Sequence, residues 1–210
     1  MPHYATHQIT PTCFLIRWQI TEPEPDLRAR LVLTTDEEAD LATIRHGAQR
    51  QQWLACRVAL AQLLAGHRHP YRGLWKDANG KPHLHHVPGH VSLAHTAGWA
   101  TAVWHQTRPV GLDVEPIRAQ HIRVVPRVLS ASEQADAGGQ PARLAVYWCA
   151  KEALYKLYGK GQLTFREHLH IDPFPTGATY LTGHVRLPHH QQTLALHCLY
   201  VEPGLVMVAY

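Results

Sequence analysis

The stretch LAVYWCAKEALYKLY at residues 144–158 decides how the second half of this chain folds. It contains no Gly or Pro, and small or apolar side chains recur along it at the spacing of one buried helical face. These side chains are Val146, Cys149, Ala150, Ala153 and Leu157. Gly159 follows directly and can adopt the left-handed conformation that ends a helix. The sequence therefore predicts a helix from residue 144 to residue 158 that buries one of its faces.

Charged side chains lie next to that buried face. Successive helical residues are about 100° apart, so Trp148, Glu152 and Lys156 are stacked one turn apart on its flank. We therefore expect an acid and a base at the edge of the core. Lys151 and Tyr155 are predicted to point further out.

A second stretch, VGLDVEP at residues 110–116, alternates as a β-strand does. Asp113 and Glu115 project from one of its faces, about 7 Å apart along the backbone. If this strand packs against the predicted helix, both acids and Glu152 can form an all-oxygen metal site with Lys156 beside it. Oxygen ligands that leave positions open for phosphate and water favour Mg²⁺ over zinc.

Each of the two motifs also has an ordinary explanation. A D-x-E pair on a strand is most often a solvated strand face, and a K-E pair in the middle of a helix is usually surface charge. The motifs that surround them change this balance.

Four motifs occur in an order that resembles a known family. They are GKPHL at 80–84, VSLAHTAGWA at 91–100, G-x-D-x-E at 111–115 and W-x-x-K-E-A-x-x-K-x-x-G-x-G at 148–161. Together they closely resemble the 4′-phosphopantetheinyl transferases, more specifically the Sfp-type family with two pseudo-symmetric halves in one chain. The resemblance covers roughly residues 45–165. One departure is Ala94, which stands where the family commonly has a serine before the histidine.

The resemblance implies an α+β fold. Two similar α/β halves would form an intramolecular pseudo-dimer, with the active site at the interface of the halves, and the protein would act as a monomer. Residues 1–106 would form an N-terminal half that contacts the nucleotide of coenzyme A. Residues 107–210 would form a C-terminal half that carries the metal site and the catalytic helix.

The resemblance also implies the reaction. These enzymes move the phosphopantetheine arm of coenzyme A onto a serine of an apo acyl or peptidyl carrier protein and release adenosine 3′,5′-bisphosphate. Asp113, Glu115 and Glu152 would hold Mg²⁺ against the pyrophosphate, and Lys156 would neutralise phosphate charge. Glu152 is also the family's favoured base for the serine hydroxyl. A carboxylate bound to a metal is a poor base, so these two roles of Glu152 compete.

Four basic residues are candidates for binding the nucleotide end of coenzyme A. By resemblance, Lys81 and His95 would contact it, including its 3′-phosphate. Arg50 and Arg57, in the helical stretch that precedes them, are further candidates. Arginine in such a stretch often only solvates a helix face.

The charge balance favours an anionic partner. The 210 residues include 20 Lys and Arg against 16 Asp and Glu, which gives a net charge of +4. Coenzyme A is anionic and carrier proteins as a class are acidic, so both fit. Nucleic acid would fit the charge too, but the basic residues are spread out and the aromatic residues follow no RNA-binding pattern. We therefore expect no nucleic-acid partner.

Cysteine usage and hydropathy set further limits. The four cysteines are scattered without a C-x-x-C pair, so the sequence predicts neither a disulfide framework nor a structural zinc site. The longest early apolar run, residues 13–16, is too short for a signal peptide or a membrane span. We therefore expect a cytoplasmic protein that does not contact membranes.

Shorter patterns predict the remaining elements. Strands are expected at residues 13–18, 31–33, 91–94, 99–105, 180–187, 193–201 and 205–210, and helices at 36–44, 49–64, 119–128 and 132–137. Asp36 is the predicted cap of its helix. Ser130 and Glu133 form a predicted capping box, which explains Glu133 by helix initiation rather than by catalysis.

Two other classes of protein share some of these features. A Mg²⁺-dependent nuclease also uses acids and a lysine, but the common pattern places a lysine two residues after the second acid, where this chain has Ile117. A non-catalytic module that binds coenzyme A or a carrier protein would be expected to lack at least one metal carboxylate, and all three remain. Neither a G-x-G-x-x-G motif nor a Walker A loop is present.

Overall fold

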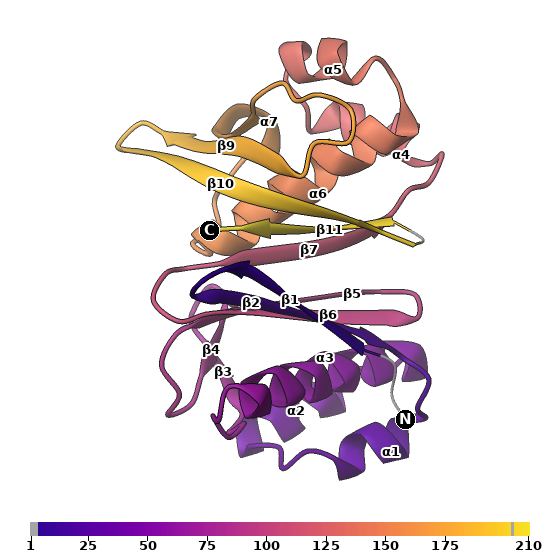
Figure 1. Ribbon diagram of the computed structural model, residues 1–210, viewed down its shortest axis with the longest axis vertical. Helices are drawn as coiled ribbons and strands as arrows, with labels where there is room; N and C mark the ends of the chain where they lie inside the picture. Colours follow the sequence, from indigo (N-terminus) through magenta and orange to yellow (C-terminus); the bar gives the residue numbers. More distant parts are fainter. Residues whose placement is uncertain (1–3, 203) are drawn as a thin grey trace. The chain divides into compact units, whose positions relative to one another are not determined.

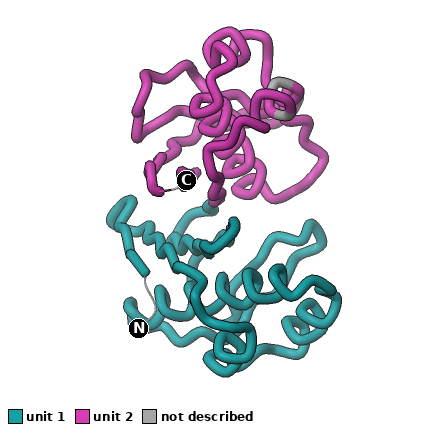
Figure 2. Tube along the Cα trace, turned by 90° about the vertical axis from the view of Figure 1, so that its right-hand side faces the viewer, with its two compact units in different colours: residues 1–110 teal, residues 111–210 magenta. Residues whose placement is uncertain are grey.

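The computed structural model describes residues 4–202 and 204–210, and the chain divides into two compact units between Val110 and Gly111 (Figure 2). The division lies close to the predicted boundary between residues 106 and 107. Each unit combines an antiparallel sheet with helices, so the predicted α+β class is confirmed. No helix in the described part of the chain is long and apolar enough to cross a membrane.

The N-terminal unit is built on a four-stranded antiparallel sheet in the order β1-β2-β6-β5 (Figure 1). Its strands are β1 (Tyr4–Thr10), β2 (Cys13–Gln19), β5 (His90–Thr96) and β6 (Trp99–His105). Helix α3 (Gly47–Gly66) packs against β2, β5 and β6. The core between helix and sheet includes Ile16, Leu60 and Trp104, each at most 1% exposed. Burial of these side chains stabilises the unit by the hydrophobic effect.

Four shorter elements complete this unit. They are α1 (Glu24–Ala29), α2 (Thr35–Thr43), β3 (Leu74–Lys76) and β4 (Pro82–Leu84). The strand predicted at residues 31–33 is wrong, because this segment connects α1 to α2 without regular structure. Leu31 turns into the core while Val32 is 90% exposed, so the short apolar run anchors a connection rather than a sheet edge.

Helix α2 begins at a different cap from the predicted one. The prediction of Asp36 is wrong, because the Thr34 hydroxyl accepts a hydrogen bond from the Glu37 amide at 3.3 Å. The Glu37 carboxylate accepts one from the Thr34 amide, also at 3.3 Å. Thr34 and Glu37 thus form a capping box.

The C-terminal unit is built on a five-stranded antiparallel sheet in the order β7-β11-β10-β9-β8. Its strands are β7 (Gly111–Pro116), β8 (Leu169–Ile171), β9 (Tyr180–Leu187), β10 (His190–Val201) and β11 (Gly204–Ala209). Helix α6 (Pro141–Tyr158) packs against β7 and β11 (Figure 1). The short helices are α4 (His121–Val124), η1 (Val125–Arg127), α5 (Ala131–Ala137) and α7 (Phe165–His168).

Helix α6 is the predicted helix, extended at its start. It begins at Pro141 rather than at residue 144 because proline suits the first helical position, where its missing amide hydrogen has no partner to lose. It ends before Gly159, which has φ +65° as the sequence predicts. The prediction that Lys151 points outward is wrong. Its side chain is fully buried, because Glu133 and two backbone carbonyls complete its hydrogen bonds.

Strand β7 and helix α6 approach each other very closely at Gly111. A Cβ atom at this position would clash with the carbonyl oxygen of Ala153 and would lie 2.5 Å from the amide nitrogen of Leu157. Real Cβ atoms do not approach backbone atoms this closely, so only glycine permits this packing distance. The glycine of the G-x-D-x-E motif therefore sets how near the two acids of the strand lie to the helix.

We expect Gly111→Ala to destabilise the protein by more than about 2 kcal/mol, because overpacking forces the backbone to shift. Urea unfolding measures this. Gly66→Ala is the matched control, because a Cβ there meets nothing within 4 Å and the backbone needs no positive φ. Equal stability of the two variants would contradict the close-contact explanation.

Candidate active site

The structure brings four of the predicted site residues together within the C-terminal unit. Asp113 and Glu115 come from β7, and Glu152 and Lys156 come from α6. The Lys156 ammonium donates a hydrogen bond to Asp113 Oδ1 at 2.7 Å, which joins strand and helix directly. Burial and the mutual charges of this group shift the pKa values of Glu115, Glu152 and Lys156. We call these four residues the carboxylate cluster.

Asp113 has an unusual environment for a carboxylate. Its side chain is nearly buried, and Oδ1 is bound by Lys156. Oδ2 is buried and accepts no hydrogen bond from the described residues. The Cys149 thiol lies against this carboxylate, but a thiol is only a weak donor. A buried acceptor without a partner costs about 1–3 kcal/mol, so Oδ2 is an oxygen suited to a cation.

Glu115 is held by Trp148 and His121, two side chains to which the sequence assigned no role. The Trp148 indole nitrogen donates to Glu115 Oε1 at 2.9 Å. His121 Nε2 lies 3.8 Å from Glu115 Oε2, and His121 Nδ1 accepts a hydrogen bond from the Arg118 amide. Burial, followed by the charge of Asp113, raises the pKa of Glu115. No sequence signal distinguishes His121 from the other 17 histidines, because only folding brings it beside the acid.

Glu152 titrates close to neutrality. Burial, followed by the charge of Asp113, raises its pKa from 4.5 to about 7. A carboxyl group with such a pKa can both accept and hold a proton near physiological pH, which suits a general base. A bound cation would favour the ionised form and so lower this pKa.

Lys156 is the counter-charge of the cluster. Burial disfavours its charged form, but the carboxylates of Asp113 and then Glu152 outweigh that effect and raise its pKa. The ammonium group is therefore charged at neutral pH. Three carboxyl groups against one ammonium group leave the cluster rich in acceptors, which fits a divalent cation with oxygen ligands.

The cluster is not a ready-made cage of three ligands. Within residues 4–202 and 204–210, no three His, Cys, Asp or Glu side chains converge on a position that could hold a metal ion. Lys156 occupies Asp113 Oδ1 and Trp148 occupies Glu115 Oε1. The residues nevertheless fit Mg²⁺, which is usually bound through one or two carboxylates and keeps waters or substrate phosphates in its other positions.

Two of the predicted nucleotide contacts line one cavity in the N-terminal unit. Arg57 and His95 face a space of about 190 Å³. The other lining residues are Trp53, Cys56, Lys76, Pro82 and Leu93. Lys76 was missed by the sequence analysis, because a lysine in a three-residue strand carries no motif. We call this space the basic cavity.

Arg57 is fixed rather than solvated. It is 4% exposed, its Nε donates to Glu37 Oε1 at 2.9 Å, and its guanidinium group lies over the Trp53 ring at 3.1 Å from the centroid. Arg50 instead donates to Glu24 at 2.8 Å. Neither Arg50 nor Lys81 is among the described residues that line the basic cavity.

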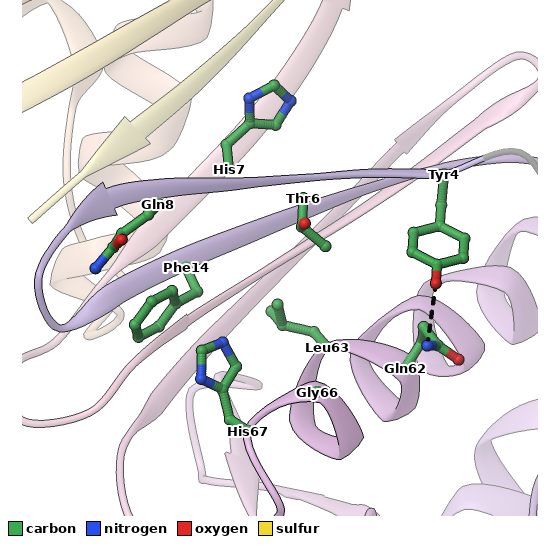
Figure 3. Close-up of a pocket in the computed structure, with 9 residues that line it drawn as sticks. All are labelled: Tyr4, Thr6, His7, Gln8, Phe14, Gln62, Leu63, Gly66 and His67. Atoms are coloured by element: carbon green, nitrogen blue, oxygen red, sulfur yellow. Dashed lines mark hydrogen bonds between the residues drawn. The ribbon is translucent and has the colours of Figure 1, made fainter.

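A second cavity of about 380 Å³ lies between strand β1 and the end of helix α3 (Figure 3). Phe14, His67 and Gln62 line it, and Gln62 hydrogen-bonds the Tyr4 hydroxyl at 3.4 Å. None of the predicted site residues lines this cavity.

Comparisons with known proteins agree with the motifs. Residues 109–202 match the model of the 4′-phosphopantetheinyl transferase superfamily. This match spans the strand and the helix that carry the carboxylate cluster. The family resemblance drawn from the sequence is therefore confirmed for this segment of the chain.

One curated relative extends the similarity. The chain is 31% identical over 141 residues to the 4′-phosphopantetheinyl transferase psf-1 of Bacillus pumilus. The alignment covers 62% of this chain and 57% of that protein, so the chain spans little more than half of the relative's length.

We expect Glu152→Gln to stabilise the metal-free protein at pH 8 and to have no effect near pH 4. The folded-state pKa of about 7 lies above the ordinary value of 4.5, so the wild type loses stability as the pH rises from about 4.5 to 7. The loss is at most about 3 kcal/mol. Urea unfolding in EDTA at both pH values measures it. The exposed Glu167→Gln is the control, and a wild type as stable as Glu152→Gln at pH 8 would refute the raised pKa.

Proposed function

We propose that this protein transfers the 4′-phosphopantetheine group of coenzyme A to a serine of an apo acyl or peptidyl carrier protein, with Mg²⁺ as cofactor and adenosine 3′,5′-bisphosphate as the second product. The observation that carries the proposal is the buried Asp113 Oδ2, which accepts no hydrogen bond from the residues that the structure describes, in a cluster of three carboxyl groups beside Lys156. This cluster lies inside the segment matched by the family model.

The reaction needs charge neutralisation more than covalent chemistry. The serine oxygen forms a bond to the phosphorus of the phosphopantetheine group, and the bond from that phosphorus to the bridging oxygen of the pyrophosphate breaks. Negative charge grows on the leaving bisphosphate. Mg²⁺, held by Asp113, Glu115 and Glu152, would supply the main opposing charge. The charged Lys156 ammonium group would supply a second one.

Glu152 is the proposed acceptor of the serine proton. Its pKa of about 7 in the metal-free protein fits a base that works near neutrality. Ligation of Mg²⁺ by the same carboxylate would lower its basicity. Asp113 and Glu115 are therefore the proposed principal ligands whenever Glu152 takes the proton, and the two roles of Glu152 remain in competition.

The basic cavity is the proposed site for the nucleotide end of coenzyme A. Arg57 and Lys76 bring cationic groups, which also pair with Glu37 at 2.9 Å and Asp40 at 2.6 Å. His95 brings an imidazole that can donate to a phosphate oxygen. Trp53 offers an aromatic face. Contacts from Arg50 and Lys81 stay predictions, as do the pseudo-dimer of halves, the active site at their interface and the monomeric state.

The positive net charge of the chain supports an acidic carrier protein as the second substrate. A net charge of +4 favours association with an acidic partner. The rival nuclease function receives no support from the cluster, because Ile117 stands where its lysine would be needed and is 41% exposed.

Mass spectrometry of apo carrier proteins incubated with the protein, coenzyme A and Mg²⁺ tests the proposal. We expect a gain of one phosphopantetheine mass. Asp113→Asn should lower the turnover more than about 100-fold, because it removes charge that acts on the transition state. Lys156→Ala should act in the same direction but less severely, and the exposed Glu167→Gln should behave as wild type. No mass gain on any carrier would refute the transferase, and a near-normal Asp113→Asn would refute the site.

His95→Ala should raise the half-saturating concentration of coenzyme A about tenfold or more, since a hydrogen bond to a charged group contributes about 1.5–3 kcal/mol. Turnover at saturating coenzyme A should stay close to wild type. Initial rates at varied coenzyme A measure both quantities, with the exposed His189→Ala as control. A fall in turnover without a change in half-saturation would contradict the nucleotide contact.

A further inference from the structure

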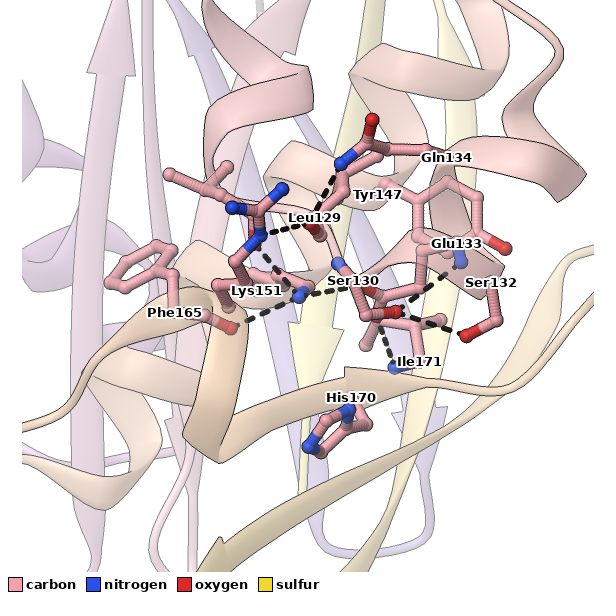
Figure 4. Close-up of polar contacts among 12 residues, drawn as sticks. Leu129, Ser130, Ser132, Glu133, Gln134, Tyr147, Lys151, Phe165, His170 and Ile171 are labelled. Atoms are coloured by element: carbon pink, nitrogen blue, oxygen red, sulfur yellow. Dashed lines mark hydrogen bonds and ion pairs between the residues drawn. The ribbon is translucent and has the colours of Figure 1, made fainter.

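Lys151 belongs to the motif on α6 but takes no part in the proposed chemistry. Its side chain is fully buried. Its ammonium group lies 2.7 Å from Glu133 Oε2, 3.0 Å from the Val128 carbonyl oxygen and 3.0 Å from the Phe165 carbonyl oxygen (Figure 4). An ammonium group has three donors, so all of them are used inside the protein. Lys151 therefore cannot act on a substrate.

Both carboxylate oxygens of Glu133 also have hydrogen-bond partners inside the protein. It is 3% exposed, and its Oε2 accepts the Ser130 amide at 2.7 Å as well as Lys151. Its Oε1 accepts the Ile171 amide at 2.9 Å. One buried ion pair thus ties the start of α5, the start of α7 and the end of β8 to the helix α6 (Figure 4).

A second set of contacts reinforces the same segment. The Leu129 carbonyl oxygen accepts hydrogen bonds from Arg166 Nε at 2.9 Å and from Gln134 Nε2 at 3.1 Å. The connection before α5 and the start of α7 are therefore held to each other as well as to Lys151.

Such a pair is a poor source of stability. Removing two charges from water costs about as much as their attraction returns, and apolar replacements of similar volume are often as stable. A buried ion pair with every donor and acceptor filled does, however, hold its neighbours in one geometry.

A series of direct contacts connects Lys151 to the carboxylate cluster. Lys151 fixes the backbone of Phe165, whose ring packs against Trp148 at 6.0 Å and Tyr155 at 5.3 Å between centroids. Trp148 lies one turn before Lys151 on α6 and donates its indole hydrogen to Glu115 Oε1. Phe165 thus covers the indole ring that orients one of the proposed metal ligands.

We propose that Lys151 and Glu133 are positioning residues that act through Phe165 and Trp148 to hold Glu115 in the orientation that Mg²⁺ binding requires. This inference rests on the proposed function, because it assigns Glu115 to the metal site. The ion pair sets the affinity for the cation and leaves the binding of coenzyme A to the Mg²⁺-loaded protein unchanged.

The test uses the double variant Lys151→Met/Glu133→Gln. A single substitution would strand one buried charge and endanger the fold, whereas the double variant removes both charges. Methionine fills the space of the lysine stem, and glutamine keeps the capping box. Urea unfolding checks that the variant is folded under assay conditions.

We expect the half-saturating Mg²⁺ concentration for transfer to rise about tenfold or more. At saturating Mg²⁺, the half-saturating coenzyme A concentration should stay within about twofold of wild type. Trp148→Phe removes the donor to Glu115 and should have a similar effect on Mg²⁺. Both changes are proposed to act through the same contacts. The triple variant should therefore raise the half-saturating Mg²⁺ concentration no further than the more damaging of the two changes does alone, whereas independent effects would multiply.

The matched control is Arg143→Met/Asp136→Asn in the same unit. This pair also joins α5 to α6, and Arg143 also binds a backbone carbonyl, that of Phe174, but it has no contact with Phe165 or Trp148 among the described residues. An equal rise in the Mg²⁺ requirement of this control would overturn the proposal, because the effect would then be general loosening. Multiplying effects of Trp148→Phe and the double variant would overturn it too.

A readout without substrate separates this inference from the proposed function. The fluorescence of Trp148 is obtained by subtracting the signal of a Trp148→Phe protein from that of the same protein with Trp148. Acrylamide quenching of this fluorescence should be at least about twofold stronger in the double variant than in the wild type. Unchanged quenching would overturn the proposal. If the wild type modifies no carrier protein, the proposed function fails, and the quenching result still decides whether the ion pair positions Trp148.

Discussion

The candidate active site depends on the close packing of strand β7 against helix α6. Gly111 permits it, because any side chain at that position would collide with the backbone of the helix. The 2.7 Å hydrogen bond from Lys156 to Asp113 then spans strand and helix. Two acids from an extended segment and one from a helix come close enough to change each other's proton affinity. Without this contact the motif residues would remain separate surface charges.

The cluster departs from the rules that stabilise the rest of the fold. Asp113 Oδ2 is buried without a hydrogen-bond partner in the described part of the chain, and the pKa of Glu152 is about 7. Both features oppose folding of the metal-free protein. Lys156 offsets only part of this cost, since one ammonium group faces three carboxyl groups. Local departures of this kind are typical of functional sites, where a ligand completes what the chain leaves unsatisfied.

Both units use the same device to bury a cation on their long helix. In each, a short helix begins with a capping box whose glutamate also pairs with a basic residue: Glu37 with Arg57 on α3, and Glu133 with Lys151 on α6. A glutamate at the third helical position is already held by the cap, so it reaches its partner at little further loss of side-chain freedom. In the first unit the cation lines the basic cavity, and in the second it supports the segment next to the cluster.

Local sequence patterns are enough to predict the elements that carry chemistry. Helix α6, its end at Gly159, strand β7 and the order of the motifs follow from local periodicity and spacing. Tertiary structure decided what covers each side chain. A helical wheel predicts that Lys151 points outward, because it cannot show the segments of α5 and α7 that enclose this side chain. Nor can it show the Glu37 carboxylate that fixes Arg57. Likewise, His121 and Lys76 join their sites only through folding, because burial and charge pairing depend on residues distant in the chain.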